Sequence, residues 1–282
     1  MKKGVLAGAG GTGRPLLGGL LGAFAVALVL SSCACRSDRR AGRSEPPRPP
    51  VPREPSTPPG PLDPSARPRP PVGKVVLSRI RDADLCFTTG GAGRLATHRM
   101  MIGEAKMRAV ARDSVGDAAE LRFTYLGPTE EVVRLASGSL RRQLGLKLRA
   151  ADGCNLVYVM WRLEPKAELV VSVKRNPGER THRECGTNGY RNVRPRRAQA
   201  PPLLEPGAAH TLRADLVGDE LLVRIDGQEV WQGALGQDVL SLAGPAGMRT
   251  DNVRLEAELL SQLAPAGRPA ADGLVVCANG SD

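Results

Sequence analysis

The sequence predicts an all-β fold, a two-sheet antiparallel sandwich built by residues 75–262. Apolar and polar residues alternate with a period of two in several separate runs, so each run has one hydrophobic face and one hydrated face. The dipeptide Asp226-Gly227 separates two of these runs and is typical of a tight hairpin turn. No segment of the domain shows the longer period of an extended amphipathic helix.

Five runs carry this alternation, and the spacing leaves room for about twelve strands in all. Residues 156–161 and 169–173 are instead apolar on both faces, so we expect them to be central strands joined by a turn at Glu164-Pro165-Lys166. The side chains expected to face the core in the five alternating runs are Leu121, Phe123 and Tyr125; Leu144, Leu146 and Leu148; Leu212, Ala214 and Leu216; Leu221, Val223 and Ile225; and Val253, Leu255, Ala257 and Leu259.

Residues 1–32 have the layout of an export signal, with lysines at the start and an uncharged run at 16–30. That run is about fifteen residues long, short of the roughly twenty that span a bilayer, which disfavours the alternative of an uncleaved transmembrane helix. The run ends in Leu-Ser-Ser-Cys, which resembles the lipobox of bacterial lipoproteins. The resemblance implies cleavage before Cys33, lipidation of Cys33 and anchoring of the exported protein to a membrane, with an ordinary signal peptide as the other alternative. Because Ala34 follows where Asp would mark inner-membrane retention, we expect the outer membrane in a host that has two.

Residues 33–74 follow the signal as a tether. Positions 36–74 contain thirteen prolines and eight arginines and almost no aliphatic side chain. Such a segment buries too little apolar surface to fold, and proline keeps it extended. A proline-rich ligand for the groove of a partner protein is the alternative.

The net charge of +11 is spread along the chain and does not mark a nucleic-acid-binding domain. The export signal carries +3 and the tether +5, so only +3 remains for residues 75–282. A nearly balanced domain has no strong field for phosphate groups, so we expect no nucleic-acid partner. The arginine-rich tether is better suited to anionic lipid or to an acidic wall polymer.

Four cysteines follow the tether, and an even number in an exported chain favours disulfides. A hairpin is expected between Cys154 and Cys185, so we predict that these two residues pair. Cys86 is then left to pair with Cys277, which would tie an otherwise loose tail, residues 263–282, to the domain.

Three parts of the C-terminal half carry a resemblance to a known fold family. They are the strand-like run that opens at His210, the run Leu-Leu-Val-Arg-Ile-Asp-Gly-Gln-Glu-Val-Trp across Asp226-Gly227, and the Gly-Pro-Ala-Gly loop before the last run, which ends at Leu259. This order resembles a concanavalin A-like jelly roll of the laminin-G or glucanase-like type. The resemblance implies a jelly roll for the whole domain but no particular activity, because the fold hosts lectins, adhesion modules, hydrolases and spacers.

The sequence contains no recognisable catalytic or metal-binding motif. Laminarinase-type members of the resembling family carry Glu-x-Asp-x-x-Glu on one strand, whereas no Glu in this chain has Asp two positions later. The three histidines have no metal-ligand spacing, and the cysteines lack the close pairs of zinc sites, so a zinc site with His182 is only an alternative to the disulfides. We therefore expect no catalytic residue, no metal and no cofactor.

Basic residues gather after the expected strand at 169–173 and continue through a Gly-rich stretch. Arginine offers planar donors for carboxylate or sulfate, and a tyrosine ring stacks on sugars, so this stretch is the predicted ligand site. A solvated loop, with its tyrosine over a disulfide, is the alternative. The residues predicted to face a ligand are Lys174, Arg175, Arg183, Tyr190 and Arg191.

Together these features favour a monomeric, membrane-anchored envelope lipoprotein whose jelly-roll domain binds an envelope or extracellular polysaccharide. A structural or protein-interaction module without a glycan ligand is the second interpretation. A glycoside hydrolase that lacks the usual motif is the third.

Overall fold

The computed structural model describes residues 75–95 and 99–265, which form a jelly-roll sandwich of two antiparallel sheets. The export signal, the tether and residues 266–282, and with them Cys33 and Cys277, lie outside the described residues. Within the described part, no helix combines the length and the hydrophobicity needed to cross a membrane.

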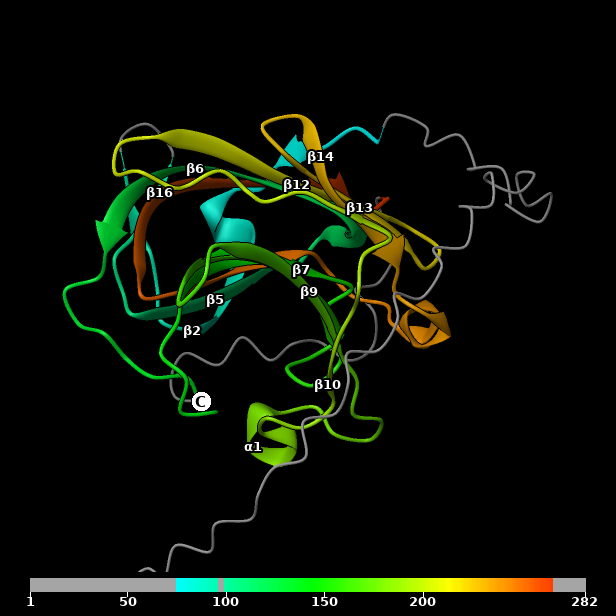
Figure 1. The fold of residues 1–282 in the computed structure, drawn as a ribbon. Helices are drawn as coiled ribbons and strands as arrows, with labels where there is room; N and C mark the ends of the chain where they lie inside the picture. Colours follow the sequence, from blue (N-terminus) through cyan, green and yellow to red (C-terminus); the bar gives the residue numbers. More distant parts are fainter. Residues whose placement is uncertain (1–74, 96–98, 266–282) are drawn as a thin grey trace, which may run out of the picture. The chain divides into compact units, whose positions relative to one another are not determined.

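The first sheet has nine strands and forms the upper layer in Figure 1. Its strand β1 (Ser78–Arg79) lies beside β16 and outside the main order. In spatial order the other strands are β11 (Arg197–Ala198), β14 (Gln228–Ala234), β13 (Glu220–Ile225), β12 (Ala209–Val217), β6 (Ser114–Pro128), β16 (Val253–Leu263), β4 (Met100–Ile102) and β3 (Gly93–Arg94).

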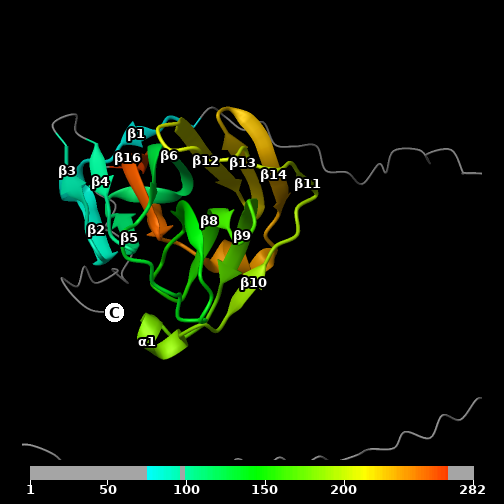
Figure 2. The same cartoon turned by 60° about the vertical axis from the view of Figure 1, so that its left-hand side comes forward.

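The second sheet has seven strands and forms the lower layer in Figure 1, where it arches so that its concave side is turned away from the first sheet, towards α1. Both sheets are seen again in Figure 2. In spatial order its strands are β10 (Tyr190–Asn192), β9 (Glu168–Lys174), β8 (Leu156–Glu164), β7 (Arg142–Leu148), β15 (Gly247–Asp251), β5 (Lys106–Ala111) and β2 (Leu85–Thr89).

The described residues thus contain sixteen strands, more than the twelve expected. The excess reflects very short strands: β1, β3, β4, β10 and β11 are each only two or three residues long. A run of that length is too short to show alternation in the sequence.

The core lies between the two sheets, and the five predicted inward-facing sets all belong to it. Each of these side chains is at most 5% exposed, as the alternation predicts for one buried face. Phe123 of one sheet meets Trp161 of the other edge to face, with ring centroids 5.8 Å apart. Trp231 is also buried, so neither tryptophan is available as an exposed stacking ring.

The turns follow the sequence signals. Asp226 and Gly227 both have positive φ, 50° and 80°, and connect β13 to β14, which is the backbone that a tight hairpin requires. The carboxylate of Asp226 also accepts a hydrogen bond from the backbone N–H of Thr211, 2.7 Å away, so the turn is fastened to β12. The predicted strands at 156–161 and 169–173 are confirmed as β8 and β9, each flanked by a strand on both sides.

Among residues 75–95 and 99–265, helical structure is confined to short segments: α1 (His182–Cys185) and the 3-10 turns at Asp82–Asp84 and Gln237–Ser241. Glu184 closes the start of α1, because its carboxylate accepts hydrogen bonds from the backbone N–H groups of Arg180 and Thr181, both 2.8 Å away. These two bonds, followed by one from the Thr181 side chain, lower the pKa of Glu184.

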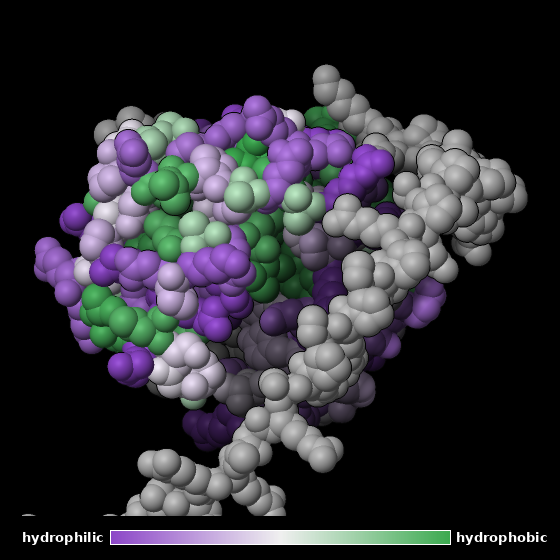
Figure 3. All heavy atoms as spheres, in the orientation of Figure 1, coloured by the Kyte–Doolittle hydropathy of each residue, from purple (hydrophilic) through white to green (hydrophobic). Residues whose placement is uncertain are grey.

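The surface seen in the orientation of Figure 1 mixes hydrophilic and hydrophobic residues. Hydrophilic side chains interrupt the hydrophobic patches of the described part (Figure 3). Scattered apolar residues of this kind are normal on a protein surface and mark no site by themselves. Strand register, in contrast, brings chemistry-bearing side chains together on the faces of the sheets.

Candidate functional site

The outward face of the seven-stranded sheet, the side turned away from the core, carries the candidate site. Along β8, Val157, Val159 and Trp161 belong to the core, whereas Tyr158 and Met160 belong to a separate hydrophobic cluster on the opposite side. Successive residues of a strand point to opposite sides, so strand register shows which side chains share the outward face. Register places six chemistry-bearing side chains on this face, spread from β5 to the edge strand β10: Arg108, Gln143, Tyr158, Tyr190, Arg249 and Asp251.

Two arginines share one carboxylate at the centre of the outward face. Arg249 on β15 is the direct neighbour of Arg108 on β5, and two like charges facing each other across strands repel. Asp251, two residues after Arg249 and therefore on the same side, accepts hydrogen bonds from both guanidinium groups, at 3.1 Å from Arg108 and 2.8 Å from Arg249. Gln143 on β7 donates a third bond, at 2.7 Å.

This cluster keeps an excess of positive charge, because Asp251 compensates only one of the two arginines. Asp251 is fully buried and Arg249 is 9% exposed, whereas the side chain of Arg108 keeps 21% exposure. Burial, and then the charge of Arg249, lower the pKa of Arg108. For Arg249, burial acts in the same direction, but Asp251 and the two tyrosines outweigh it and raise the pKa. Both groups are cations at neutral pH.

Tyr158 and Tyr190 stack beside the arginines, with ring centroids 6.0 Å apart and planes inclined by 22°. The guanidinium carbon of Arg249 lies 5.2 Å from the centre of the Tyr158 ring, in cation–π geometry. Burial first, and then Tyr158, raise the pKa of Tyr190, whereas Arg249 acts in the opposite direction and lowers it. The residue as a whole nevertheless remains 42% exposed.

A glycine makes the contact between Arg249 and Tyr158 possible. These residues lie on β15 and β8, and β7 runs between the two strands with Gly145 in register with Arg249. A β-carbon at Gly145 would stand 2.9 Å from Met160 and 2.1 Å from the carbonyl oxygen of Val159, so no side chain fits there. The bare position lets the arginine reach across β7 to the tyrosine pair.

The predicted pair Cys154–Cys185 is confirmed, with the two α-carbons 5.9 Å apart and the β8–β9 hairpin between them in sequence. Cys86 is disulfide-bonded and 2% exposed. Its expected partner Cys277 lies outside the described residues, so that pairing stays a prediction.

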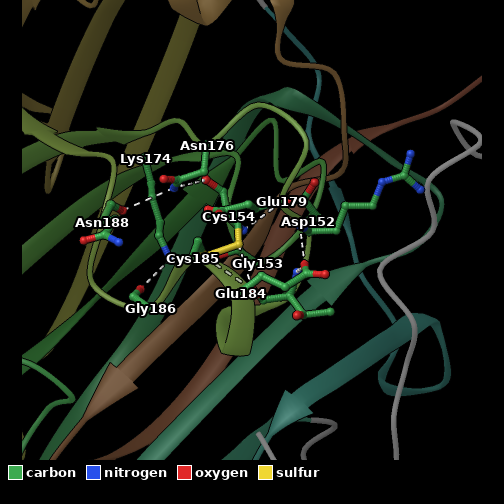
Figure 4. The surroundings of a disulfide bond; sticks show 12 residues. Asp152, Gly153, Cys154, Lys174, Asn176, Glu179, Glu184, Cys185, Gly186 and Asn188 are labelled. Carbon is green, nitrogen blue, oxygen red and sulfur yellow. Dashed lines mark hydrogen bonds between the residues drawn. A yellow bond between two sulfur atoms is a disulfide. The ribbon is translucent and has the colours of Figure 1, made fainter.

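Lys174 does not fit the predicted ligand-facing position, because its side chain is fully buried. Its ammonium group donates to the carbonyl oxygens of Gly153 and Gly186, both at 3.1 Å, and lies 3.0 Å from the sulfur of Cys185 (Figure 4). It also lies 5.0 Å from the centre of the Tyr190 ring. The lysine therefore fastens the disulfide loop to β9 and supports Tyr190 instead of meeting a ligand.

The other predicted residues are not gathered in one place. Arg175 is half-buried and donates to the side-chain oxygen of Asn155 at 2.9 Å. Arg183 is exposed on α1. Arg191 neighbours Tyr190 on β10, so it points to the opposite side, where it donates to the carbonyl oxygen of Leu235 at 2.7 Å. Of the predicted set, Tyr190 alone reaches the outward face with an exposed ring.

Sequence reasoning missed Arg108, Gln143, Tyr158, Arg249 and Asp251. A signal was present in Arg249-Thr250-Asp251, where the spacing of two puts a cation and an acid on one side of a strand. Three residues are too few to show strand alternation, so the sequence alone does not identify this stretch as a strand. In the described residues no group of three or more His, Cys, Asp or Glu side chains is arranged to hold a metal ion.

No family model matches the sequence, and no curated protein sequence matches it. Solved structures with a similar fold include carbohydrate-binding module CBM66 from Bacillus subtilis, at 11% identity and a TM-score of 0.43 over 64% of this chain and 94% of that one. The carbohydrate recognition domain of Emp46p has 11% identity and a TM-score of 0.41, over 65% and 89%. The Caenorhabditis elegans galectin LEC-6 has 12% identity and a TM-score of 0.36, over 60% and 100%. Similarities at this level do not bear on what the present chain binds.

Proposed function

We propose that the protein is an envelope lipoprotein whose jelly-roll domain binds an anionic polysaccharide on the outward face of its seven-stranded sheet. The observation that carries the proposal is the pair Arg108 and Arg249, which shares the single carboxylate of Asp251 beside two stacked tyrosines. The arrangement leaves one guanidinium charge uncompensated next to a partly exposed aromatic ring. Acidic sugars offer the matching chemistry, a carboxylate or sulfate group on a ring with apolar C–H faces.

The exposed members of the cluster are the expected ligand contacts. Arg108 and Tyr190 remain partly open, whereas Arg249, Asp251 and Tyr158 are at most 9% exposed. The buried residues therefore act as positioning residues that hold the Arg108 guanidinium and the Tyr190 ring in fixed places. A binding group held in advance loses less entropy when a ligand arrives.

A panel of matched acidic and neutral polysaccharides, applied to the mature exported protein, tests the proposal. We expect acidic polymers to bind, neutral ones to bind weakly or not at all, and affinity to fall as salt rises. Tyr190→Ala should weaken binding about tenfold, the loss of one stacking contact of about 1–1.5 kcal/mol. Arg108→Gln should weaken binding at least as much and reduce the salt dependence.

Arg197→Gln is the matched control, because Arg197 is exposed on β11 in the other sheet and loses the same charge. Equal losses in Arg108→Gln and Arg197→Gln would mean that total charge, and not the outward face, governs binding. Absence of binding to every polymer would favour the structural or protein-interaction module. Release of reducing ends from any polymer would favour a hydrolase.

A further inference from the structure

The outward face carries apolar side chains, on β8 and also on β5 and β2, that point away from the core. Cys86, Val110, Ala150, Leu156, Tyr158 and Met160 form a hydrophobic cluster separate from the main core, each at most 5% exposed. Residues on a sheet face lose their exposure only where other atoms cover them. The cluster must therefore be covered from the side that faces away from the sandwich.

Described residues account for the cover at one end. Tyr190 stacks on Tyr158, and the loop closed by Cys154 and Cys185 lies beside Leu156. Val110 and Cys86 lie in the same cross-strand row as Tyr158, but three and four strands away from it. At the usual spacing of about 4.8 Å between strands, Cys86 is roughly 19 Å from Tyr158, which is beyond the reach of a tyrosine ring.

The chain leaves the sandwich close to this second end. The backbone N–H of Ala264, just after β16, donates to the carbonyl oxygen of Asp113, 2.8 Å away. Asp113 follows β5 by two residues, and within β5 Val110 is the partner of Cys86. Cys277 lies twelve positions after Pro265, and an extended segment of that length spans about 40 Å. The C-terminal segment therefore has ample length to reach the row.

We infer that residues 273–277, Gly-Leu-Val-Val-Cys, dock on the outward face over Val110 and are tied there by a disulfide between Cys277 and Cys86. Cys86 is disulfide-bonded, and the described cysteines Cys154 and Cys185 are already joined to each other. In an extended segment Val275 shares a side with Cys277, so both face the sheet. The docked segment covers Val110 and Cys86 at the β5–β2 edge of the face, two residues along β5 from Arg108.

Peptide mapping of the mature, non-reduced protein is the first test, and it needs no variant. We expect a linked peptide that contains Cys86 and Cys277. A link from Cys86 to Cys33, to Cys35 or to a second copy of the chain would overturn the inference. The result does not depend on any glycan, so it separates this inference from the proposed polysaccharide binding.

The second test asks whether the segment packs against the apolar row. Val275→Asp should raise the fluorescence of a dye that binds exposed apolar surface and lower Tm by about 3 °C or more, because a charge cannot be buried there without a partner. Ala270→Asp places the same charge in the same segment, outside residues 273–277, and should change neither reading. Equal behaviour of the two variants would show that the segment does not cover the face, even if the disulfide is present.

Discussion

At the scale of single residues, Lys174 is a buried cation with a structural role. Its ammonium group is fully buried, and its hydrogen bonds go to the carbonyl oxygens of Gly153 and Gly186 and to the sulfur of Cys185. Burial first, and then the positive charge of Arg249, lower the pKa of Lys174 from 10.5 to about 8. The charged form is thus less favourable in the folded protein than in the unfolded chain, where the lysine is hydrated.

This shift predicts a stability that rises with pH. Between pH 8 and 10.5 the unfolded chain binds more protons at Lys174 than the folded protein does, so the free energy of unfolding increases over that window. The full gain is on the order of 3 kcal/mol, the equivalent of the shift in pKa. We expect urea unfolding to show a rise between pH 8 and 10 in the wild type that is absent in Lys174→Met. Lys166→Met, at an exposed site in the β8–β9 turn, should keep the wild-type slope, and the same slope in both variants would contradict the prediction.

At the scale of elements, the hairpin β8–β9 is closed at its base by the disulfide between Cys154 and Cys185, which are 31 positions apart. In the chain-entropy model a loop of this size stabilises the folded state by roughly 3–4 kcal/mol, because it restricts the unfolded chain. Replacing both cysteines with alanine should lower the free energy of unfolding by about this amount in denaturant titrations. It should also release the loop that holds Lys174 beneath Tyr190.

Two outcomes decide this prediction. A loss below about 1 kcal/mol would mean that the loop is held by its hydrogen bonds and not by the disulfide. A loss of roughly 3–4 kcal/mol in the free energy of unfolding, with unchanged affinity for acidic polymers, would show that the binding surface does not depend on the disulfide. The wild type under reducing conditions is an unsuitable substitute, since Cys86 is disulfide-bonded as well.

The elements also show what the sequence can and cannot predict. Alternation identifies Leu121, Phe123 and Tyr125 as core residues because one face of β6 is buried and the other is wet. The same rule has nothing to say about β8, where residues 156–161 are buried on both faces. Here local pattern cannot tell the core side from the outward side, and only pairing with β7 and β9 decides it.

The candidate site escaped prediction for a related reason. Arg108 and Asp251 are 143 positions apart in the chain and meet only because β15 pairs with β5. Local charge density instead pointed to the stretch after β9, where Arg175 and Arg191 bind neighbouring polar groups and do not converge. A site built from long-range strand pairing leaves little trace in any short window of sequence, whereas Tyr190 was found because it lies in a polar, Gly-rich stretch.

At the scale of the whole molecule, charge and composition divide the chain into distinct parts. The tether carries +5 and the domain with its tail +3, yet the domain places arginines side by side on one sheet face. At the polyproline rise of about 3.1 Å per residue, a fully extended tether of residues 33–74 would hold the domain up to about 130 Å from the proposed anchor at Cys33. Such a reach suits a domain that meets a polymer beyond the membrane surface.

The anchor itself provides the last prediction. Lipidation is expected at Cys33, because the chain there ends an apolar run with Leu-Ser-Ser-Cys. Cys33→Ser should leave the protein unprocessed or release it into the soluble fraction, since a serine cannot form the thioether that carries the diacylglycerol. Cell fractionation and the mass of the mature chain measure both effects. Cys35→Ser is the matched control, because it removes the neighbouring thiol. Cys35 has Cys33 two positions before it and therefore fits the lipobox pattern poorly, so its loss should leave processing and membrane attachment unchanged. Normal cleavage together with full membrane retention in Cys33→Ser would show that something other than a lipid on this cysteine holds the protein.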